Sequence, residues 1–287
     1  MNRYTAGLLA ALTAVIGPVA ALPATAAEAS VRAEAATAVA AAPAPLRVLP
    51  LGDSITWGIG SPSGNSYRGF LANQLTAEGH ALDFVGSGRN GPMPDPDNEG
   101  HSGWRIDQIA AITDATLSRY RPNVVTLEIG TNDLNQNYQV ATAADRLSTL
   151  IDQITRNAPD ATVLVGSLIV STSPTEEASR PAFNQRIPGI VQAAQAAGRH
   201  VRLVDMGALN AADLSDSLHP NDNGFEKMAN AFNAGVQAAD AVGWIKAPVA
   251  LGGEVRSGIA GKCLDVSAAA TANGTAVQIW SCNGTRA

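Results

Sequence analysis

Short apolar runs alternate with amphipathic segments along most of the chain. Apolar runs of four to eight residues bounded by turn residues are typical of buried strands, and apolar positions three or four residues apart are typical of helices. The runs predict strands at 46–51, 82–85, 124–129, 162–170 and 201–204. The amphipathic segments predict helices at 66–78, 106–120, 141–157, 181–197 and 223–242.

This alternation of strand and helix predicts a parallel sheet with right-handed crossovers and helices on both faces. Two prolines conflict with the pattern. Pro50 lies in the first predicted strand and has no N–H for the ladder, so that strand either stops by Leu49 or ends irregularly. Pro188 is expected to kink or divide the helix predicted at 181–197. Residues 89–104 are rich in Gly, Pro, Asp and Asn and predict a long loop, which is usually functional.

The first strand ends in Gly52-Asp53-Ser54. This predicts a tight turn that exposes the Ser54 hydroxyl at the carboxyl end of the sheet, where open α/β folds place their sites. Serine is a weak nucleophile alone, so it needs a base and donors for the oxyanion it creates. The alternative is that Asp53 and Ser54 only cap a helix.

The first 27 residues have the pattern of a secretory signal peptide. Arg3 is the only charge before an apolar stretch at 6–22, and small residues follow at 24–27. A membrane anchor is the alternative, although Gly17-Pro18 interrupts the stretch. Residues 28–45, rich in Ala and Pro, predict a flexible linker. The mature protein is therefore expected to be secreted and extracellular.

The end of the chain has a different character. Residues 46–246 form the predicted main domain, 247–253 a second linker, and 254–287 a β-rich piece too small for a core of its own. The two cysteines, Cys263 and Cys282, both lie in this piece. Because an exported protein meets an oxidising environment, they predict a disulfide.

The composition of the chain limits which classes of binding partner are expected. The 287 residues are 46% hydrophobic and 15% charged, which is enough apolar material for a large core. A net charge of -6 leaves no basic footprint, so nucleic acid is not an expected partner. No segment after the leader is apolar enough to span a membrane, and neither cysteine has a histidine nearby. We expect no membrane partner after signal cleavage, no metal and no cofactor; the oligomeric state stays open.

Four histidines compete for the role of base. His80 follows a helix-ending glycine and is expected at the surface, and His200 precedes a strand and is expected to be structural. His101 lies in the long loop, and His219 lies in a loop before the last helix.

Asp216 lies three residues before His219, so its carboxylate can accept from one imidazole nitrogen while the other faces a serine. Asp213 and Asp222 have less favourable spacing. The alternative is that Asp216 only caps a turn and His219 lies at the surface.

Three groups could donate to an oxyanion. Asn132 follows the strand at 124–129, at the same sheet edge as Ser54, although it could also be a simple turn residue. The Ser54 N–H is a second donor. A loop glycine, Gly86 or Gly103, could supply a third.

In order along residues 46–244, four short motifs resemble the sequence blocks of the SGNH hydrolases, also called GDSL esterases: Gly52-Asp53-Ser54, a loop glycine, Gly130-x-Asn132-Asp133 and Asp216-x-x-His219. The resemblance implies a flavodoxin-like α/β sandwich of three layers, with a five-stranded parallel sheet in the order 2-1-3-4-5. It also implies Ser54 as nucleophile, His219 as base and Asp216 as its orienter, with an oxyanion hole of Ser54, the loop glycine and Asn132.

Residues 83–87 and 99–106 resemble, more narrowly, the acetyl xylan esterases of carbohydrate esterase family 3. That resemblance favours Gly103 over Gly86 and makes His101 a residue that orders the loop. It implies a secreted serine esterase that removes acetyl groups from a polysaccharide, and xylan is the polysaccharide it favours. The alternatives are a lipase or thioesterase on the same fold and a non-catalytic carbohydrate-binding protein.

Residues 261–266, 273–275 and 278–280 resemble the first repeat of a ricin-type β-trefoil lectin. A complete trefoil has three such repeats, and the alternative is a loosely docked tail. In a whole module, Asp265 and Gln278 would contact the sugar. A chain ending near Trp244 is therefore expected to keep its activity on both a soluble ester and insoluble xylan.

Overall fold

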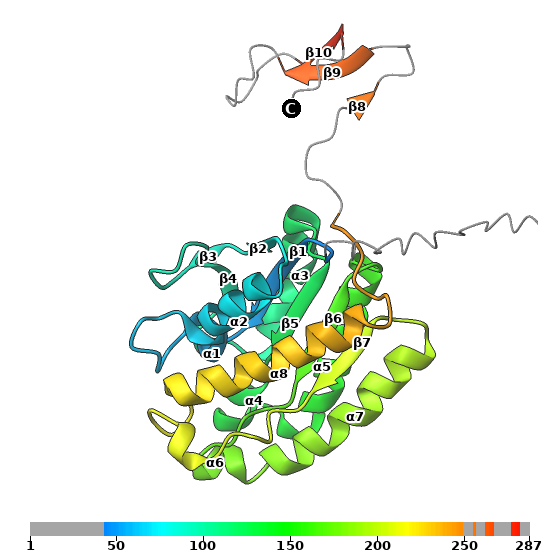
Figure 1. The fold of residues 1–287 in the computed structure, drawn as a ribbon. Coiled ribbons are helices and arrows are strands. Elements are labelled where there is room, and N and C mark those ends of the chain that lie inside the picture. Colours follow the sequence, from blue (N-terminus) through cyan, green and yellow to red (C-terminus); the bar gives the residue numbers. More distant parts are fainter. Residues whose placement is uncertain (1–42, 249–254, 257–261, 267–276, 282–287) are drawn as a thin grey trace, which may run out of the picture. The chain divides into compact units, whose positions relative to one another are not determined.

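The structure, a computed structural model, describes residues 43–248, 255–256, 262–266 and 277–281 (Figure 1). The predicted signal peptide, nearly all of the first linker, most of the second linker and Cys282 lie outside these residues. The strands within 43–248 are β1 (Leu46–Gly52), β2 (Leu82–Phe84), β3 (Gly88–Arg89), β4 (Asp97–Gly100), β5 (Val124–Glu128), β6 (Thr162–Gly166) and β7 (Val201–Val204).

The α-helices are α1 (Ser54–Trp57), α2 (Ser66–Ala77), α3 (Ile106–Tyr120), α4 (Thr131–Asn135), α5 (Ala143–Asn157), α6 (Pro174–Glu177), α7 (Arg180–Ala196) and α8 (Asp222–Asp240). Short 3₁₀ turns lie at Val140–Thr142 and Ala211–Asp213. The long helices agree with the predicted ones to within two residues at either end, because each carries one apolar stripe. α7 is not divided at Pro188.

The sheet has the predicted parallel order. β1 lies at its centre, paired with β2 on one side and β5 on the other, and β6 and β7 follow outward in parallel. This is the 2-1-3-4-5 order of a flavodoxin-like α/β fold. Helices α2 and α8 cover one face and α3, α5 and α7 the other (Figure 1). The carboxyl ends of β1 and β5 therefore meet at one edge.

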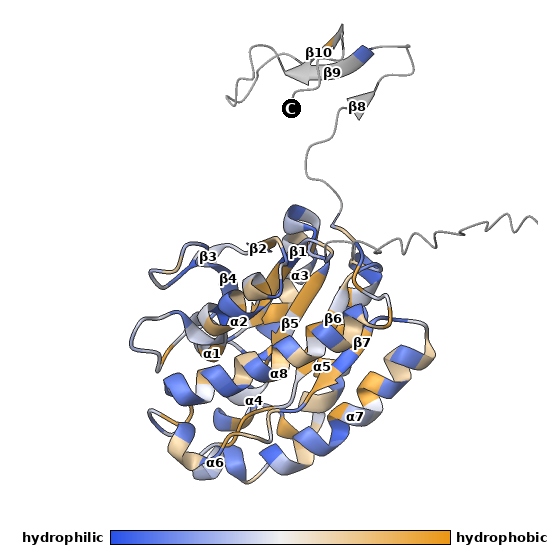
Figure 2. Ribbon diagram, viewed as in Figure 1, coloured by the Kyte–Doolittle hydropathy of each residue, from blue (hydrophilic) through white to orange (hydrophobic). Residues whose placement is uncertain are grey.

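Two apolar layers hold the sandwich together. Side chains alternate along β1, so that Leu49 and Leu51 face α3 and α5 while Leu46 and Val48 face α2 and α8. The apolar strands lie inside and the polar faces of the helices outside (Figure 2). At about 25 cal/mol per Å² of buried apolar surface, these two layers are the main stabilising contribution.

Pro50 does not shorten β1, which runs to Gly52. Val48 O accepts from Val85 N–H, and Gly52 O accepts from His101 N–H. The backbone groups of every second residue of β1 therefore point to the side on which β2 and β4 pair. Pro50 lies between the last pair with β2 at Val48 and the first pair with β4 at Leu51. Pro50 thus lacks an N–H at the point where β2 ends and β4 begins as the neighbour of β1.

The long loop predicted at 89–104 is partly strand. β4 adds to β1 in parallel beyond the end of β2, and β3 pairs antiparallel with β4. β4 consists of Asp97, Asn98, Glu99 and Gly100, so it has no apolar alternation that could have predicted it.

Near the end of the chain, β8 (Val255–Arg256), β9 (Lys262–Val266) and β10 (Val277–Ser281) form a separate antiparallel sheet in the order β10-β9-β8. Gln278 lies opposite Asp265 in this ladder. Among the described residues, no helix has both the length and the apolar character that a membrane span requires.

Candidate active site

Ser54 lies directly beyond the central strand, as the first residue of α1. At Gly52 a side chain would collide with the Glu128 carbonyl and the Thr56 hydroxyl, so the turn needs glycine. Asp53 caps α1 by accepting from Ile55 N–H at 3.0 Å. The capping interpretation is therefore correct for Asp53, and it does not exclude the catalytic one, because the same turn directs Ser54 to His219. Ser54 is only 6% exposed, so it is less open to solvent than predicted.

Ser54, His219 and Asp216 form a connected chain of hydrogen bonds. Ser54 Oγ lies 2.9 Å from His219 Nε2, and His219 Nδ1 lies 2.8 Å from Asp216 Oδ2. A carboxylate only accepts, so Nδ1 donates to Asp216 and Nε2 is left to accept from the serine hydroxyl. This is the geometry that a serine–histidine–aspartate triad requires.

Asp216 is held by its own turn. Its Oδ1 accepts from the N–H groups of Leu218 and His219, each at 2.8 Å. Partial burial tends to raise the pKa of Asp216, but these bonds and the contact with His219 outweigh it and hold the pKa below the usual value. The side chain is 51% exposed, so solvent screens its charge.

Asn132 lies in α4, at the carboxyl end of β5, with its amide in the site. Nδ2 donates to Asp53 Oδ2 at 3.1 Å and to Trp104 O at 3.0 Å. The motif that carries Ser54 and the motif that carries the Asn132 amide are thus joined directly. Sequence reasoning missed this role of Asp53; its position directly before Ser54 in the chain is the one signal that could have suggested it.

Asp53 is fully buried, and burial is the largest cause that raises its pKa, to about 7. The hydrogen bond from Ile55 N–H opposes this rise, the nearby carboxylate of Asp133 adds to it, and the bond from Asn132 opposes it again. Asp53 therefore titrates in the neutral range while it orients Asn132.

The two candidate glycines have different surroundings. Gly86 is buried against β4, where a side chain would collide with the backbone of Asn98. Gly103 is exposed at φ +79°, and apart from its chain neighbours no described residue comes within 4 Å of the position of a Cβ. Its carbonyl accepts from Gln136 Nε2 at 3.0 Å, and the next residue, Trp104, contacts Asn132. Gly103 therefore stays the preferred candidate.

The other histidines lie elsewhere. His80 is buried, not exposed as expected, because its ring contacts Ala44 O at 3.0 Å through Nδ1. His200 stacks on Trp244, as a structural residue does. His101 stacks on Trp104 in the loop that contains Gly103.

The rival carboxylates are also occupied. Asp213 Oδ2 pairs with Lys227 Nζ at 2.6 Å, and Asp222 Oδ1 accepts from Ser61 Oγ at 3.3 Å. Neither is bonded to His219 within the described part of the chain.

Two buried acids behind the site were not foreseen. Glu176 is 1% exposed, and neither carboxylate oxygen of Glu128 has a hydrogen-bond partner among the described residues. Burial is the main cause that raises the pKa of Glu176 to about 7 and that of Glu128 well above its usual value. Asp53 repels both groups. Glu128 is the last residue of β5 and Glu176 lies in α6, but sequence alone does not reveal that an acid is buried.

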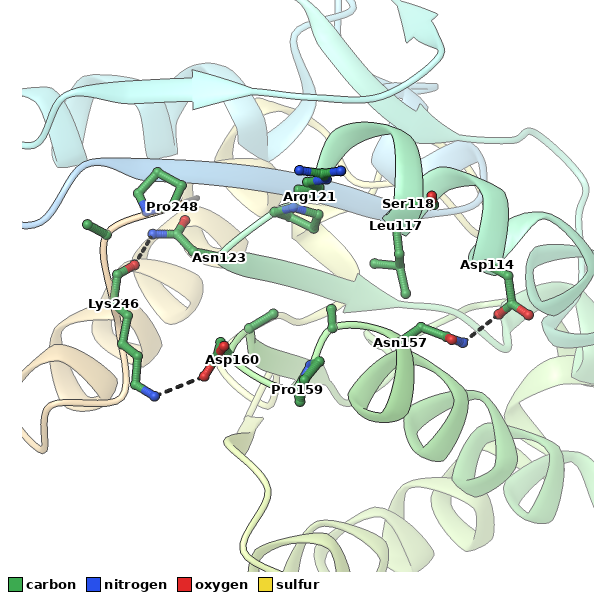
Figure 3. Close-up of a pocket in the computed structure, with 14 residues that line it drawn as sticks. Asp114, Leu117, Ser118, Arg121, Asn123, Asn157, Pro159, Asp160, Lys246 and Pro248 are labelled. Carbon is green, nitrogen blue, oxygen red and sulfur yellow. Dashed lines mark hydrogen bonds and ion pairs between the residues drawn. The ribbon is translucent and has the colours of Figure 1, made fainter. Parts of the chain in front are cut away.

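A cavity of about 440 Å³ lies at the opposite edge of the sheet, near the amino ends of β5 and β6 (Figure 3). Asn123, the ion pair of Lys246 with Asp160 and the bond from Asn157 to Asp114 line it. It is far from the carboxyl edge that carries Ser54. In the described residues, no cluster of three or more His, Cys, Asp or Glu could hold a metal ion.

What the sequence predicts for the last segment remains a prediction. Asp265 and Gln278 lie in β9 and β10, but only their backbone is described. The expected disulfide involves Cys282, which lies outside the described residues.

Known proteins resemble this chain over the same region. Residues 51–227 match the GDSL-like Lipase/Acylhydrolase family. A family 3 carbohydrate esterase from Clostridium thermocellum is 40% identical, with a TM-score of 0.63, over 69% of this chain and 98% of that one. An acetyl esterase variant solved with an acetate ion is 28% identical, with a TM-score of 0.60, over 69% of this chain and 99% of that one.

A multidomain esterase from Ruminococcus flavefaciens is 28% identical over 218 residues, which is 64% of this chain. The aligned part spans only 27% of the length of that protein.

The fold, the strand order and the serine–histidine–aspartate geometry are those of an SGNH hydrolase, and the chain belongs to the GDSL-like lipase/acylhydrolase family. Within it, the chain is similar to family 3 carbohydrate esterases. Its reaction class is thus the hydrolysis of esters.

Proposed function

We propose that this protein is a secreted serine esterase that removes acetyl groups from a polysaccharide, acetylated xylan in particular. The observation that carries the proposal is the continuous chain from Ser54 Oγ through His219 to Asp216, at 2.9 and 2.8 Å. The acetyl group and the sugar polymer are supported by similarity to a family 3 carbohydrate esterase and to an acetyl esterase.

In the proposed mechanism, Ser54 Oγ attacks the acetyl carbonyl while His219 Nε2 takes its proton. Asp216 holds the ring in the tautomer that leaves Nε2 free and stabilises the imidazolium that forms. His219 then gives the proton to the sugar oxygen as the ester bond breaks. Water attacks the acetyl-enzyme by the same route and releases acetate and free Ser54.

The tetrahedral oxyanion is proposed to rest on the N–H groups of Ser54 and Gly103 and on Asn132 Nδ2. Both hydrogens of Nδ2 have acceptors, Asp53 Oδ2 and Trp104 O. Asp53 sets the plane of the amide, and the oxyanion would share the hydrogen that now points to Trp104 O.

The test is acetate release from acetylated xylan, measured beside a series of p-nitrophenyl esters of increasing acyl length and an acetyl thioester. We expect acetate release from xylan and a steep loss of rate beyond the shortest acyl chains. Rates that rise with chain length would mean a lipase, and a preference for the thioester would mean a thioesterase.

Binding of xylan without any hydrolysis would instead favour a non-catalytic carbohydrate-binding protein. The Ser54→Ala variant is the control for contaminating activity in every arm.

We infer that residues 1–27 are removed on export and that 254–287 are a partial ricin-type repeat. The leader pattern supports export. The resemblance of residues 261–266, 273–275 and 278–280 to such a repeat supports the second point. Sequencing the N-terminus of the secreted protein tests the first point, and retention on insoluble xylan with and without residues 254–287 tests the second.

A further inference from the structure

The carboxylate of Glu99 is buried behind the loop that carries Gly103. Its side chain is 2% exposed and lies on β4, in register with Leu51 of β1. Glu99 Oε1 accepts from His101 Nε2 and from Ser87 Oγ, each at 2.7 Å, and Oε2 accepts from Ser87 N–H at 2.8 Å. Burial tends to raise the pKa of Glu99, but these bonds outweigh it and hold the pKa below the usual value.

This carboxylate fixes the ring of His101. Because a carboxylate only accepts, Nε2 of His101 donates to it, which sets the tautomer and the plane of the ring. The ring stacks on Trp104, with centroids 4.0 Å apart and planes at 16°. Trp104 N–H also donates to His101 O at 3.1 Å. The first and last residues of a four-residue turn are thus joined through both their main chains and their side chains.

Gly103 is the third residue of this turn. Its φ of +79° is the value that a type II turn requires at that position. The direction of the Gly103 N–H depends on the peptide plane between residues 102 and 103, which the turn sets. No described residue accepts a hydrogen bond from this N–H, and the space beside the residue is open.

The same turn also contacts the second donor. Trp104 O accepts from Asn132 Nδ2 at 3.0 Å. A shift of Trp104 would therefore move the Gly103 N–H and release Asn132 together.

We propose that Glu99 is a positioning residue for the oxyanion hole, acting through the His101–Trp104 stack on Gly103 and Asn132. The proposal rests on the proposed function, since it needs an oxyanion at this place. Oxyanion donors act because they are already aligned before the reaction, so a contact that only holds their alignment affects the transition state more than the bound substrate.

The experiment compares His101→Ala with His200→Ala. His200 stacks on Trp244 at 5.2 Å and 7°, far from the triad, so it is a matched control for the loss of a histidine–tryptophan stack. For each variant, kcat and KM are measured with p-nitrophenyl acetate, together with the inhibition constant of a boronic acid that forms a tetrahedral adduct on serine.

Removal of one oxyanion donor costs about 10²–10³ in kcat, so misalignment by His101→Ala is expected to cost about 10-fold. KM should change by less than about 2-fold, and the boronic acid should weaken by about the same factor as kcat falls. His200→Ala should leave all three quantities unchanged. His101→Phe, which keeps a stacked ring, should recover part of the loss.

Glu99→Gln should change the same quantities in the same direction, because an amide cannot accept from both His101 and the Ser87 N–H. If that variant does not fold, Ser87→Ala, which removes only the Oγ bond, tests the same link.

The proposal is overturned if the His101 and Glu99 variants match His200→Ala in kcat and inhibitor binding, or if they raise only KM. Failure of the proposed function would be different: Ser54→Ala would keep its turnover.

Discussion

Asp53 and Asn132 are 79 residues apart in the chain, yet Asp53 Oδ2 lies 3.1 Å from Asn132 Nδ2 in the buried floor of the site. The other oxygen of Asp53 accepts from Ile55 N–H. One carboxylate therefore sets both the start of the helix that carries Ser54 and the plane of the amide. The proposed nucleophile and a proposed oxyanion donor are aligned by the same group.

The aligned pair makes Asp53→Asn informative. An amide offers one oxygen, so it cannot accept from both Ile55 N–H and Asn132. We expect kcat on p-nitrophenyl acetate to fall by about 10-fold, less than the 10²–10³-fold expected when a donor is removed. A larger loss than in Asn132→Ala would show that Asp53 does more than orient the amide.

Removal of the amide itself is a separate prediction. Asn132→Ala is expected to lower kcat by about 10²–10³-fold with little change in KM, because the lost bond forms mainly in the transition state. Steady-state kinetics with p-nitrophenyl acetate give both constants. A change in KM alone would make Asn132 a binding or turn residue.

Ser54→Ala is expected to abolish hydrolysis, with kcat lower by about four decades or more, because no other group can form the acyl-enzyme. The variant should fold normally, since the side chain is not needed for the α1 cap. Circular dichroism and kinetics on the same sample check both points. Near-normal turnover by a folded variant would reject the mechanism.

Glu176 predicts how stability depends on pH. Burial is the main cause that raises its pKa to about 7, whereas in the unfolded chain it titrates near 4.5. Between these two pH values the folded protein keeps a proton that the unfolded chain has lost. The free energy of unfolding therefore falls as the pH rises through this window, and the loss is complete above the folded pKa.

Glu176→Gln carries no charge at any pH, so it should remove this dependence. Its melting temperature relative to wild type is expected to rise between pH 4.5 and pH 8, by an amount that corresponds to up to about 3 kcal/mol. Thermal unfolding across this range measures it, with exposed Glu226→Gln as the control. A difference that stays constant with pH would show that Glu176 is not the group that titrates.

The cysteines give a prediction that needs no kinetics. Protein purified from the medium should contain a Cys263–Cys282 disulfide, because export exposes both to an oxidising environment. Mass spectrometry before and after reduction detects it. Activity should survive reduction, since both cysteines lie outside 46–246. Free thiols in the secreted protein would show that the disulfide does not form. Loss of activity on reduction would show that catalysis depends on the disulfide.

The structure indicates that the chain can be shortened to Pro248 but not, as expected from the sequence, to Trp244 without loss of stability. Ile245 is buried, Lys246 O accepts from Asn123 Nδ2 at 2.6 Å, and Lys246 Nζ pairs with Asp160 at 2.9 Å. A chain ending at Pro248 should match the full chain in kcat and melting temperature, whereas one ending at Trp244 should melt lower. The melting temperatures of the two truncated chains test this prediction. Equal melting temperatures would show that the contacts of Ile245 and Lys246 do not stabilise the domain.

The sequence predicted the sheet and long helices because their apolar positions follow a strict period. β1 with Leu49 and Leu51, and α5 with Leu147 and Leu150, are examples. β4 was not predicted because its residues are polar or glycine. It forms where the edge of β1 is left free beyond the end of β2.

The site was predicted in part for a similar reason. Local spacing indicates Asp216 and His219, which share one turn. No local pattern indicates that Glu99 is buried against Ser87, or that His80 is covered at Ala44, because such burial depends on segments distant in sequence.

Asn123 has a consequence for how this domain can be joined to others. Its Nδ2 donates to Pro45 O and to Lys246 O, so the two ends of the domain lie side by side at the amino edge of the sheet. β1 runs from that edge to Ser54 at the other. Neighbouring domains fused to either end are therefore attached on the side away from the nucleophile. The same proximity would let a short peptide join the two ends and a surface loop be opened instead, giving a circular permutant with an unchanged site.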